Sequence, residues 1–118
     1  TCVNDVTAPE PLFANGEFHQ WNSPFANSGS GAVIATGVDP AALRVRGILD
    51  GEVKQDYPVS DMIFSPQEIV WHLAREIALY PGDVIACGTS VGAVDMVDGQ
   101  TIVIEIPGIG SLSNRLEA

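Results

Sequence analysis

The chain has few cations and few cysteines. Its 118 residues hold five lysines and arginines against fifteen aspartates and glutamates, for a formal net charge of −10 at pH 7. A phosphate backbone needs clustered cations, so this balance excludes nucleic acid as a ligand. The two cysteines, Cys2 and Cys87, fit neither a zinc site nor a CxxC redox motif. We expect both to be small, buried side chains in a reducing compartment, the cytoplasm.

Long apolar runs are absent as well. No uninterrupted apolar segment approaches the roughly 20 residues of a membrane span, and no basic segment followed by an apolar one indicates a secretory signal. Even so, 46% of the residues are hydrophobic and the mean hydropathy is +0.20, which excludes a disordered chain. Residues 1–118 are therefore expected to form a single domain with one hydrophobic core.

Strand signals dominate the later part of the sequence. Residues 33–35 are a short apolar run, and residues 43–46 alternate as a half-buried strand does. Asp50-Gly51 predicts a hairpin turn, because this pair tolerates positive φ, and residues 52–55 form the returning strand. Further strands are expected at residues 84–87, 101–106 and 112–116, the first of them fully buried.

A single main helix is predicted over about residues 65–79. Ser65 can cap its N-terminus, Pro66 suits the first helical position, and Glu68 completes a capping box. A Pro-Gly pair then ends it. Its apolar stripe recurs at helical spacing and comprises Ile69, Val70, Leu73, Ala74 and Ile77. One helix among about six strands predicts a mainly β (α+β) fold, built as a roll or barrel-like sandwich.

Residues 9–32 show neither strand nor helix periodicity and are expected to form a long irregular loop. A loop of this length in a small domain is more often functional than idle. His19 lies within it among aromatic side chains and is a candidate general base. The other histidine, His72, follows Trp71 in the predicted helix, and we expect it on the exposed side.

Two further positions could carry chemistry. Asp5 ends a buried segment, where a carboxylate must be hydrogen-bonded, paired or bound to a metal ion. Gly88-Thr89 follows a predicted buried strand, and a threonine there can donate to a carboxylate or enolate oxygen. From residue type alone, both positions are more often plain turn residues. Asp61 and Asp83 are interpreted as structural.

Asp5 and Gly88-Thr89 belong to a set of four segments that follow one another along the sequence. They are Val3-Asn4-Asp5-Val6-Thr7-Ala8, Ser60-Asp61-Met62-Ile63-Phe64, Pro81-Gly82-Asp83-Val84-Ile85 with Gly88-Thr89, and Gly108-Ile109-Gly110-Ser111-Leu112-Ser113-Asn114. In this order and at these spacings, they resemble the C-terminal part of the fumarylacetoacetate hydrolase family over nearly the whole chain. The resemblance implies the β-roll of that family and the C-terminal part of its catalytic domain, without the upstream part.

The resemblance also implies an activity. Family members split, decarboxylate, hydrate or isomerise a 2-oxo or β-dicarbonyl acid through an enolate bound to a divalent metal ion, usually Mg²⁺ or Mn²⁺. Asp5 matches the metal-binding aspartate of the family, and Thr89, with Gly88, matches its substrate-contacting threonine. Two glutamates of an upstream Glu-x-Glu motif complete that metal site. This chain has no such pair, so an upstream segment or a companion chain would supply them, and a homodimer is expected.

The sequence departs from the family pattern where the family carries cations. Pro9-Glu10 stands in place of the usual Arg-Asp, and residues 20–31 contain no lysine. The only lysine, Lys54, is expected to be solvated on the hairpin. These changes leave three functions open: a C–C hydrolase or decarboxylase, an isomerase of the 2-hydroxyhepta-2,4-dienedioate type, and a weak or inactive structural or binding subunit. A free-standing small β domain with its own pocket is the remaining alternative.

Overall fold

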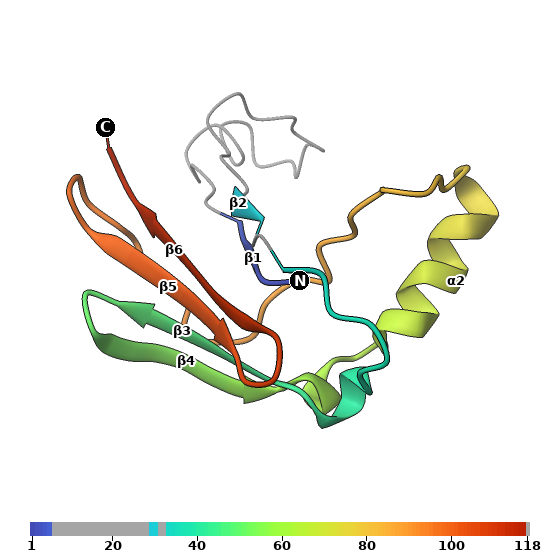
Figure 1. Cartoon of the computed structure of the whole chain (residues 1–118), viewed down its shortest axis with the longest axis horizontal. Helices are drawn as coiled ribbons and strands as arrows, with labels where there is room; N and C mark the ends of the chain where they lie inside the picture. The colour runs from blue at the N-terminus through green and yellow to red at the C-terminus, as the bar shows by residue number, and fades with distance from the viewer. Residues whose placement is uncertain (6–28, 31–32, 118) are drawn as a thin grey trace, which may run out of the picture.

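A four-stranded antiparallel sheet organises the part of the chain that the computed structural model describes, residues 1–5, 29–30 and 33–117. Its strands lie in the order β4-β3-β5-β6 (Figure 1). They are β3 (Arg44–Leu49), β4 (Glu52–Pro58), β5 (Thr101–Ile106) and β6 (Gly110–Arg115). Within this described part of the chain, the predicted mainly β fold with one main α-helix is therefore confirmed.

The β3–β4 hairpin forms as its turn sequence predicts. Asp50 has φ of 48° and Gly51 has φ of 85°, which is the pair of positive φ angles that a two-residue hairpin turn requires. Across the hairpin, the Arg44 guanidinium donates a hydrogen bond to the Asp56 carboxylate. This contact, with a weaker one from Arg46, holds the pKa of Asp56 below its ordinary value.

The small sheet at the start of the chain joins the large one at its edge. Strand β1 (Val3–Asn4) pairs antiparallel with β2 (Gly29–Ser30) and contacts β6. Asn4 is buried, and its amide nitrogen donates to the Asn114 side-chain oxygen on β6 at 3.4 Å. This contact fixes the position from which Asp5 leaves β1.

Helix α2 (Pro66–Glu76) begins at the capping box that the sequence predicts. The Ser65 hydroxyl accepts from the Glu68 backbone N–H, and the Glu68 carboxylate accepts from the Ser65 backbone N–H at 2.8 Å. The helix ends at Glu76, earlier than residue 79, because Ile77 is already extended. No described helix is long and apolar enough to cross a membrane.

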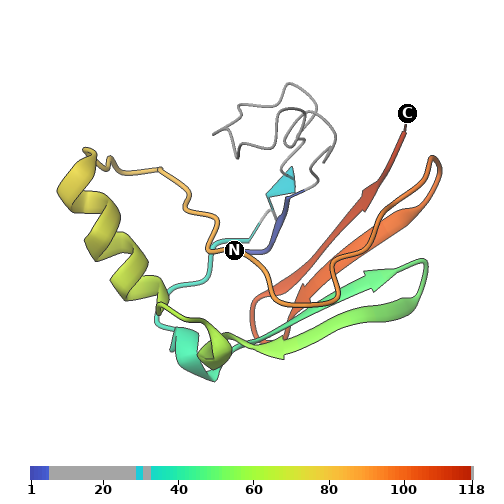
Figure 2. The same ribbon diagram turned by 180° about the vertical axis from the view of Figure 1, so that it is seen from behind.

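The apolar side of α2 has no surface against it within the described residues. None of its residues is buried, and Val70 and Trp71 remain 44% and 57% exposed. The helix stands apart from the sheet in both opposite views (Figures 1 and 2). A hydrophobic stripe at helical spacing favours burial against a partner surface. Within the described residues, the apolar face of α2 remains largely uncovered.

Two predicted strands are wrong. Residues 33–35 and 84–87 are extended but pair with no described strand, and Val84 and Ile34 are 63% and 81% exposed. Cys87 is exposed rather than buried, whereas Cys2 is buried as expected. An apolar segment becomes a buried strand only when a neighbouring strand and a second layer are present, and the described residues supply neither at these places.

The buried apolar core is correspondingly small. Four of the described hydrophobic side chains are buried, and they lie on the sheet and beside its last turn: Cys2, Leu49, Ile102 and Ile106. The strand predicted at residues 101–106 is confirmed, and Ile102 and Ile106 lie buried on it. A sheet needs a layer packed on its apolar face to form a complete core, and here one face of the sheet opens onto a cavity.

Candidate functional site

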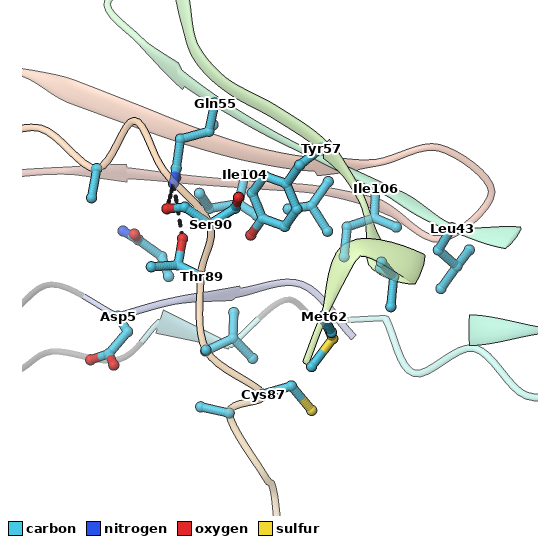
Figure 3. Close-up of a pocket in the computed structure, with 18 of the residues that line it drawn as sticks. Asp5, Leu43, Gln55, Tyr57, Met62, Cys87, Thr89, Ser90, Ile104 and Ile106 are labelled. Carbon is cyan, nitrogen blue, oxygen red and sulfur yellow. Dashed lines mark hydrogen bonds between the residues drawn. The ribbon is translucent and has the colours of Figure 1, made fainter. Parts of the chain in front are cut away.

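An open cavity of about 1580 Å³ lies over one face of the sheet. Its floor includes Val45 on β3, Tyr57 on β4 and Ile104 on β5, and its rim includes Asp5 and Thr89 (Figure 3). The lining is mainly apolar with a few polar groups, which is the usual composition of a small-molecule site. The cavity brings together two of the residues singled out from the sequence.

Thr89 reaches the cavity on a turn bounded by two glycines. Gly88 has φ of 89° and Gly92 has φ of 91°, a backbone region that favours glycine. Thr89 itself is exposed at the cavity rim. Residues 83–90 are in neither a strand nor a regular turn, and the backbone bends at Val91, so the segment before Gly88 is not the buried strand that was expected.

Gln55 on β4 holds this turn in place. Its side-chain nitrogen donates to the Thr89 hydroxyl oxygen at 2.9 Å, to the Ser90 carbonyl at 2.9 Å and to the Val91 carbonyl at 3.2 Å (Figure 3). Sequence reasoning missed this residue, because the contact joins positions more than thirty residues apart. A regular two-residue hairpin would pair Gly47 with the residue before Gln55, and the register shift directly after Gly47 brings Gln55 opposite it instead, so the sequence carried no signal for this contact.

Gly92 closes the same turn against β4. A Cβ added at this position would collide with the Lys54 carbonyl oxygen. The turn can therefore approach the strand only because residue 92 has no side chain. Together, Gln55 and Gly92 place Thr89 at a defined point on the cavity rim.

Asp5 enters the cavity rim from the end of β1, where it is exposed. Its carboxylate is a hard oxygen ligand of the kind that Mg²⁺ and Mn²⁺ prefer. Within the described residues, no group of three histidine, cysteine, aspartate or glutamate side chains could hold a metal ion. Three other carboxylates on the cavity lining, those of Asp61, Asp95 and Glu117, form no such group with Asp5. A complete site at Asp5 would thus need ligands from outside the described residues.

The structure bears differently on the expectations for His19, His72 and Lys54. His19 lies outside the described residues. His72 is exposed on α2, as expected, and packs edge-on against Phe64 and Trp71 with ring centroids 5.5 and 4.8 Å away. Lys54 is not freely solvated, because its side chain is only 29% exposed and pairs with Glu52 at 2.7 Å.

Comparison with known proteins shows which family and which proteins this chain is similar to. Residues 1–117 match the family model described as fumarylacetoacetate (FAA) hydrolase C-terminal. An uncharacterized protein of Methanocaldococcus jannaschii is 35% identical over 117 residues, which is 99% of this chain and 49% of that protein. The 4-hydroxyphenylacetate degradation bifunctional isomerase/decarboxylase of Escherichia coli is 40% identical over 78 residues, 66% of this chain and 18% of that protein.

Solved structures agree with these relatives. The 2-hydroxyhepta-2,4-diene-1,7-dioate isomerase of Mycobacterium marinum has a TM-score of 0.90 at 36% identity, covering 98% of this chain and 46% of that one. Maleylpyruvate hydrolase of Sphingobium sp. SYK-6, in complex with manganese(II) and pyruvate, has a TM-score of 0.65 at 28% identity, covering 67% and 30%.

The Methanocaldococcus jannaschii protein and the Mycobacterium marinum isomerase match nearly all of this chain, but the chain spans only about half of their length. Proteins similar to all or about two thirds of this chain include isomerases, decarboxylases, hydrolases and a tautomerase. The match extends over the four sequence segments, the sheet and the helix. This chain belongs to the fumarylacetoacetate hydrolase family.

Proposed function

We propose that residues 1–118 are the C-terminal part of the catalytic domain of a divalent-metal-dependent enzyme acting on a 2-oxo or β-dicarbonyl acid. The observation that carries this proposal is that the Asp5 carboxylate and the Thr89 hydroxyl line one cavity with a mainly apolar floor. The manganese ion and pyruvate in the related maleylpyruvate hydrolase structure support it, because pyruvate is a 2-oxo acid.

In this proposal, Asp5 contributes one ligand to Mg²⁺ or Mn²⁺. Such an ion, when bound, supplies a positive charge that stabilises negative charge developing on a substrate oxygen. The other ligands are glutamates from an upstream segment or a companion chain. The protein would act as a homodimer.

The chain's own residues bind and orient the substrate. The Thr89 hydroxyl and the backbone at Gly88 are placed to hydrogen-bond a substrate carboxylate or keto oxygen. The aromatic ring of Tyr57 and the aliphatic side chain of Ile104 on the cavity floor exclude water from the substrate's carbon skeleton. His19 is proposed as a general base.

We propose C–C hydrolysis or decarboxylation as the reaction. Isomerisation of a 2-hydroxyhepta-2,4-dienedioate-type substrate is the second candidate, favoured by the similarity to the Mycobacterium marinum isomerase. Product analysis distinguishes the three reactions. Hydrolysis gives two carbon fragments, decarboxylation releases CO₂, and isomerisation gives a product with the mass of the substrate.

Metal binding tests the central claim. The sample is the assembled protein, meaning this chain together with the segment that supplies the missing glutamates. Asp5→Asn removes a charged ligand, so we expect Mn²⁺ affinity, measured by titration calorimetry, to fall at least about tenfold. The matched control is Glu76→Gln, which removes one negative charge at the exposed end of α2, away from the cavity. Equal Mn²⁺ affinity in both variants would exclude Asp5 as a ligand.

The non-catalytic alternative has its own test. If the chain is a structural or binding subunit, the assembled protein will turn over neither oxaloacetate nor acylpyruvates at any Mg²⁺ or Mn²⁺ concentration. Metal-dependent turnover that disappears in Asp5→Asn and persists in Glu76→Gln would exclude that alternative. The same result would also indicate that the reaction takes place in the cavity that Asp5 lines.

A further inference from the structure

The turn that carries Thr89 is attached to the sheet through one side chain. The segment 84–96 pairs with no described strand, so strand hydrogen bonds do not hold it. Instead, the Gln55 side-chain nitrogen bonds three consecutive residues of the turn, at Thr89, Ser90 and Val91. A turn held in this way takes its position from β4, which is part of the rigid four-stranded sheet.

The chemistry of these three acceptors fixes the orientation of the Gln55 amide. The Ser90 and Val91 carbonyl oxygens can only accept hydrogen bonds. The amide nitrogen, and not the amide oxygen, must therefore face the turn. Its two hydrogens serve three acceptors, so one of them is shared, and the longest of the three contacts is to the Val91 carbonyl at 3.2 Å.

This orientation also decides what the Thr89 hydroxyl can do. The hydroxyl oxygen lies 2.9 Å from the Gln55 nitrogen and accepts a hydrogen from it. A hydroxyl that accepts one hydrogen bond keeps its own hydrogen for another partner. Because the Gln55 side of the hydroxyl is occupied, that hydrogen is free for an acceptor on the open side, which is the cavity that Asp5 also lines.

We propose that Gln55 is a positioning residue, which fixes the Thr89 hydroxyl as a donor to an oxygen of the substrate. This inference rests on the proposed role of Thr89 in substrate binding. A carboxylate or keto oxygen fits this donor, because both accept hydrogen bonds and carry negative charge or gain it during reaction. Gln55 does not touch the substrate and acts through Thr89.

The neighbouring strand makes room for this arrangement. Gly47 on β3 pairs with Gln55, and a Cβ at Gly47 would lie 3.1 Å from the Gln55 side-chain oxygen. A larger residue would press on the amide, whose nitrogen is already engaged on the turn. Gly47 therefore leaves the Gln55 side chain in the conformation that reaches Thr89.

A double-mutant cycle tests the proposal. Gln55→Met keeps the length of the side chain and removes the donor, and Thr89→Val keeps the shape of the threonine and removes the hydroxyl. In the assembled protein, we measure kcat and KM with oxaloacetate and, separately, the Kd for pyruvate in the presence of Mn²⁺. Thr89→Val should lower kcat/KM by about 100-fold, and Gln55→Met by about 10-fold.

The decisive value is the effect of Gln55→Met in the Thr89→Val background. If Gln55 acts through the hydroxyl, the second substitution should cost less than about threefold there, because its target is already gone. Full multiplication of the two effects would overturn the proposal. Thr89→Ser, which restores a hydroxyl, should restore sensitivity to Gln55→Met.

Gln100 provides a matched control. Its amide makes a similar clamp away from the cavity, donating to the Asp50 carboxylate at 2.9 Å and accepting from the Val97 backbone N–H at 2.9 Å. Gln100→Met should lower the Tm and leave kcat/KM and the pyruvate Kd unchanged. An equal kinetic loss in Gln100→Met would show that Gln55 matters only for general stability, and the proposal would fall.

Failure of the proposed function gives a different pattern. A wild-type protein that turns over neither oxaloacetate nor acylpyruvates, and whose Mn²⁺ affinity survives Asp5→Asn, would refute the enzyme proposal alone. The coupling between Gln55 and Thr89 in pyruvate binding would still decide the present inference. A wild-type protein with neither turnover nor pyruvate binding would overturn both.

Discussion

Single residues set the geometry of the cavity rim. Gln55 orients the Thr89 hydroxyl, Gly92 lets the turn approach the Lys54 carbonyl, and Asn4 anchors the strand that carries Asp5. None of these supporting residues carries a charge. The proposed chemistry thus depends on neutral groups, each with a specific neighbour, more than on the acidic surface of the chain.

Gly92→Ala should destabilise the assembled protein. The substitution adds a Cβ that collides with the Lys54 carbonyl, and it places alanine at a φ of 91°. We expect a loss of roughly 2–3 kcal/mol in the free energy of unfolding, measured by urea denaturation.

Gly82→Ala separates the two causes. Gly82 has a φ of 100°, but an added Cβ would meet nothing within 4 Å, so only the backbone strain of about 1 kcal/mol applies. A loss in Gly92→Ala no larger than the loss in Gly82→Ala would contradict the close approach to β4.

At the scale of the element, local signals predicted most of the fold. The Asp50-Gly51 turn and the Ser65–Glu68 capping box each act within four residues, and both form as the sequence indicates. The strand predicted at residues 84–87 was wrong, because burial needs a partner surface that the segment cannot encode. Gln55 was missed for a related reason, since its role depends on a turn that lies far away in the sequence.

The capping box should make the start of α2 sensitive to acid. Hydrogen bonds from the Ser65 hydroxyl and backbone N–H hold the pKa of Glu68 below its ordinary value. The folded state therefore binds this proton less readily than the unfolded state does. The stabilisation is present above the ordinary glutamate pKa and is lost as pH falls through the lowered one.

Amide exchange measured by NMR checks this expectation. In the first turn of α2, protection should decrease as the solution is acidified through the carboxylate range. Glu68→Gln keeps a hydrogen-bonding side chain without a titratable proton, so its protection should not vary over that range. The same acid dependence in Glu68→Gln would assign the effect to another group.

At the scale of the whole molecule, much of the apolar surface of the described chain is exposed to solvent. The exposed large hydrophobic side chains include Val70 and Trp71 on α2 and Val84 on the extended segment. The relatives are about twice as long over the same fold. We infer that the part of the fold that these relatives carry in addition packs on these surfaces and completes the core, because large apolar surface is rarely left open to water.

Hydrogen–deuterium exchange tests this inference. In the isolated chain, the backbone amides of residues 84–87 should exchange rapidly, because they lack strand partners among the described residues. In the assembled protein, they should be protected if the added part packs against them. The amides of residues 46–49 of β3, which pair on both sides, serve as the internal control. Equal exchange at 84–87 in both samples would show that the partner docks elsewhere.

Asn4 and Asn114, which hydrogen-bond to each other, stand 110 positions apart in the sequence. Strand β1 is made before every other described strand, yet it can join β6 only after residues 110–115 have left the ribosome. Contacts between such distant positions form late, because the long intervening loop must first be closed. Asp5 is therefore synthesised well before the strand that positions it, and it reaches its place on the cavity rim only once β6 has joined the sheet.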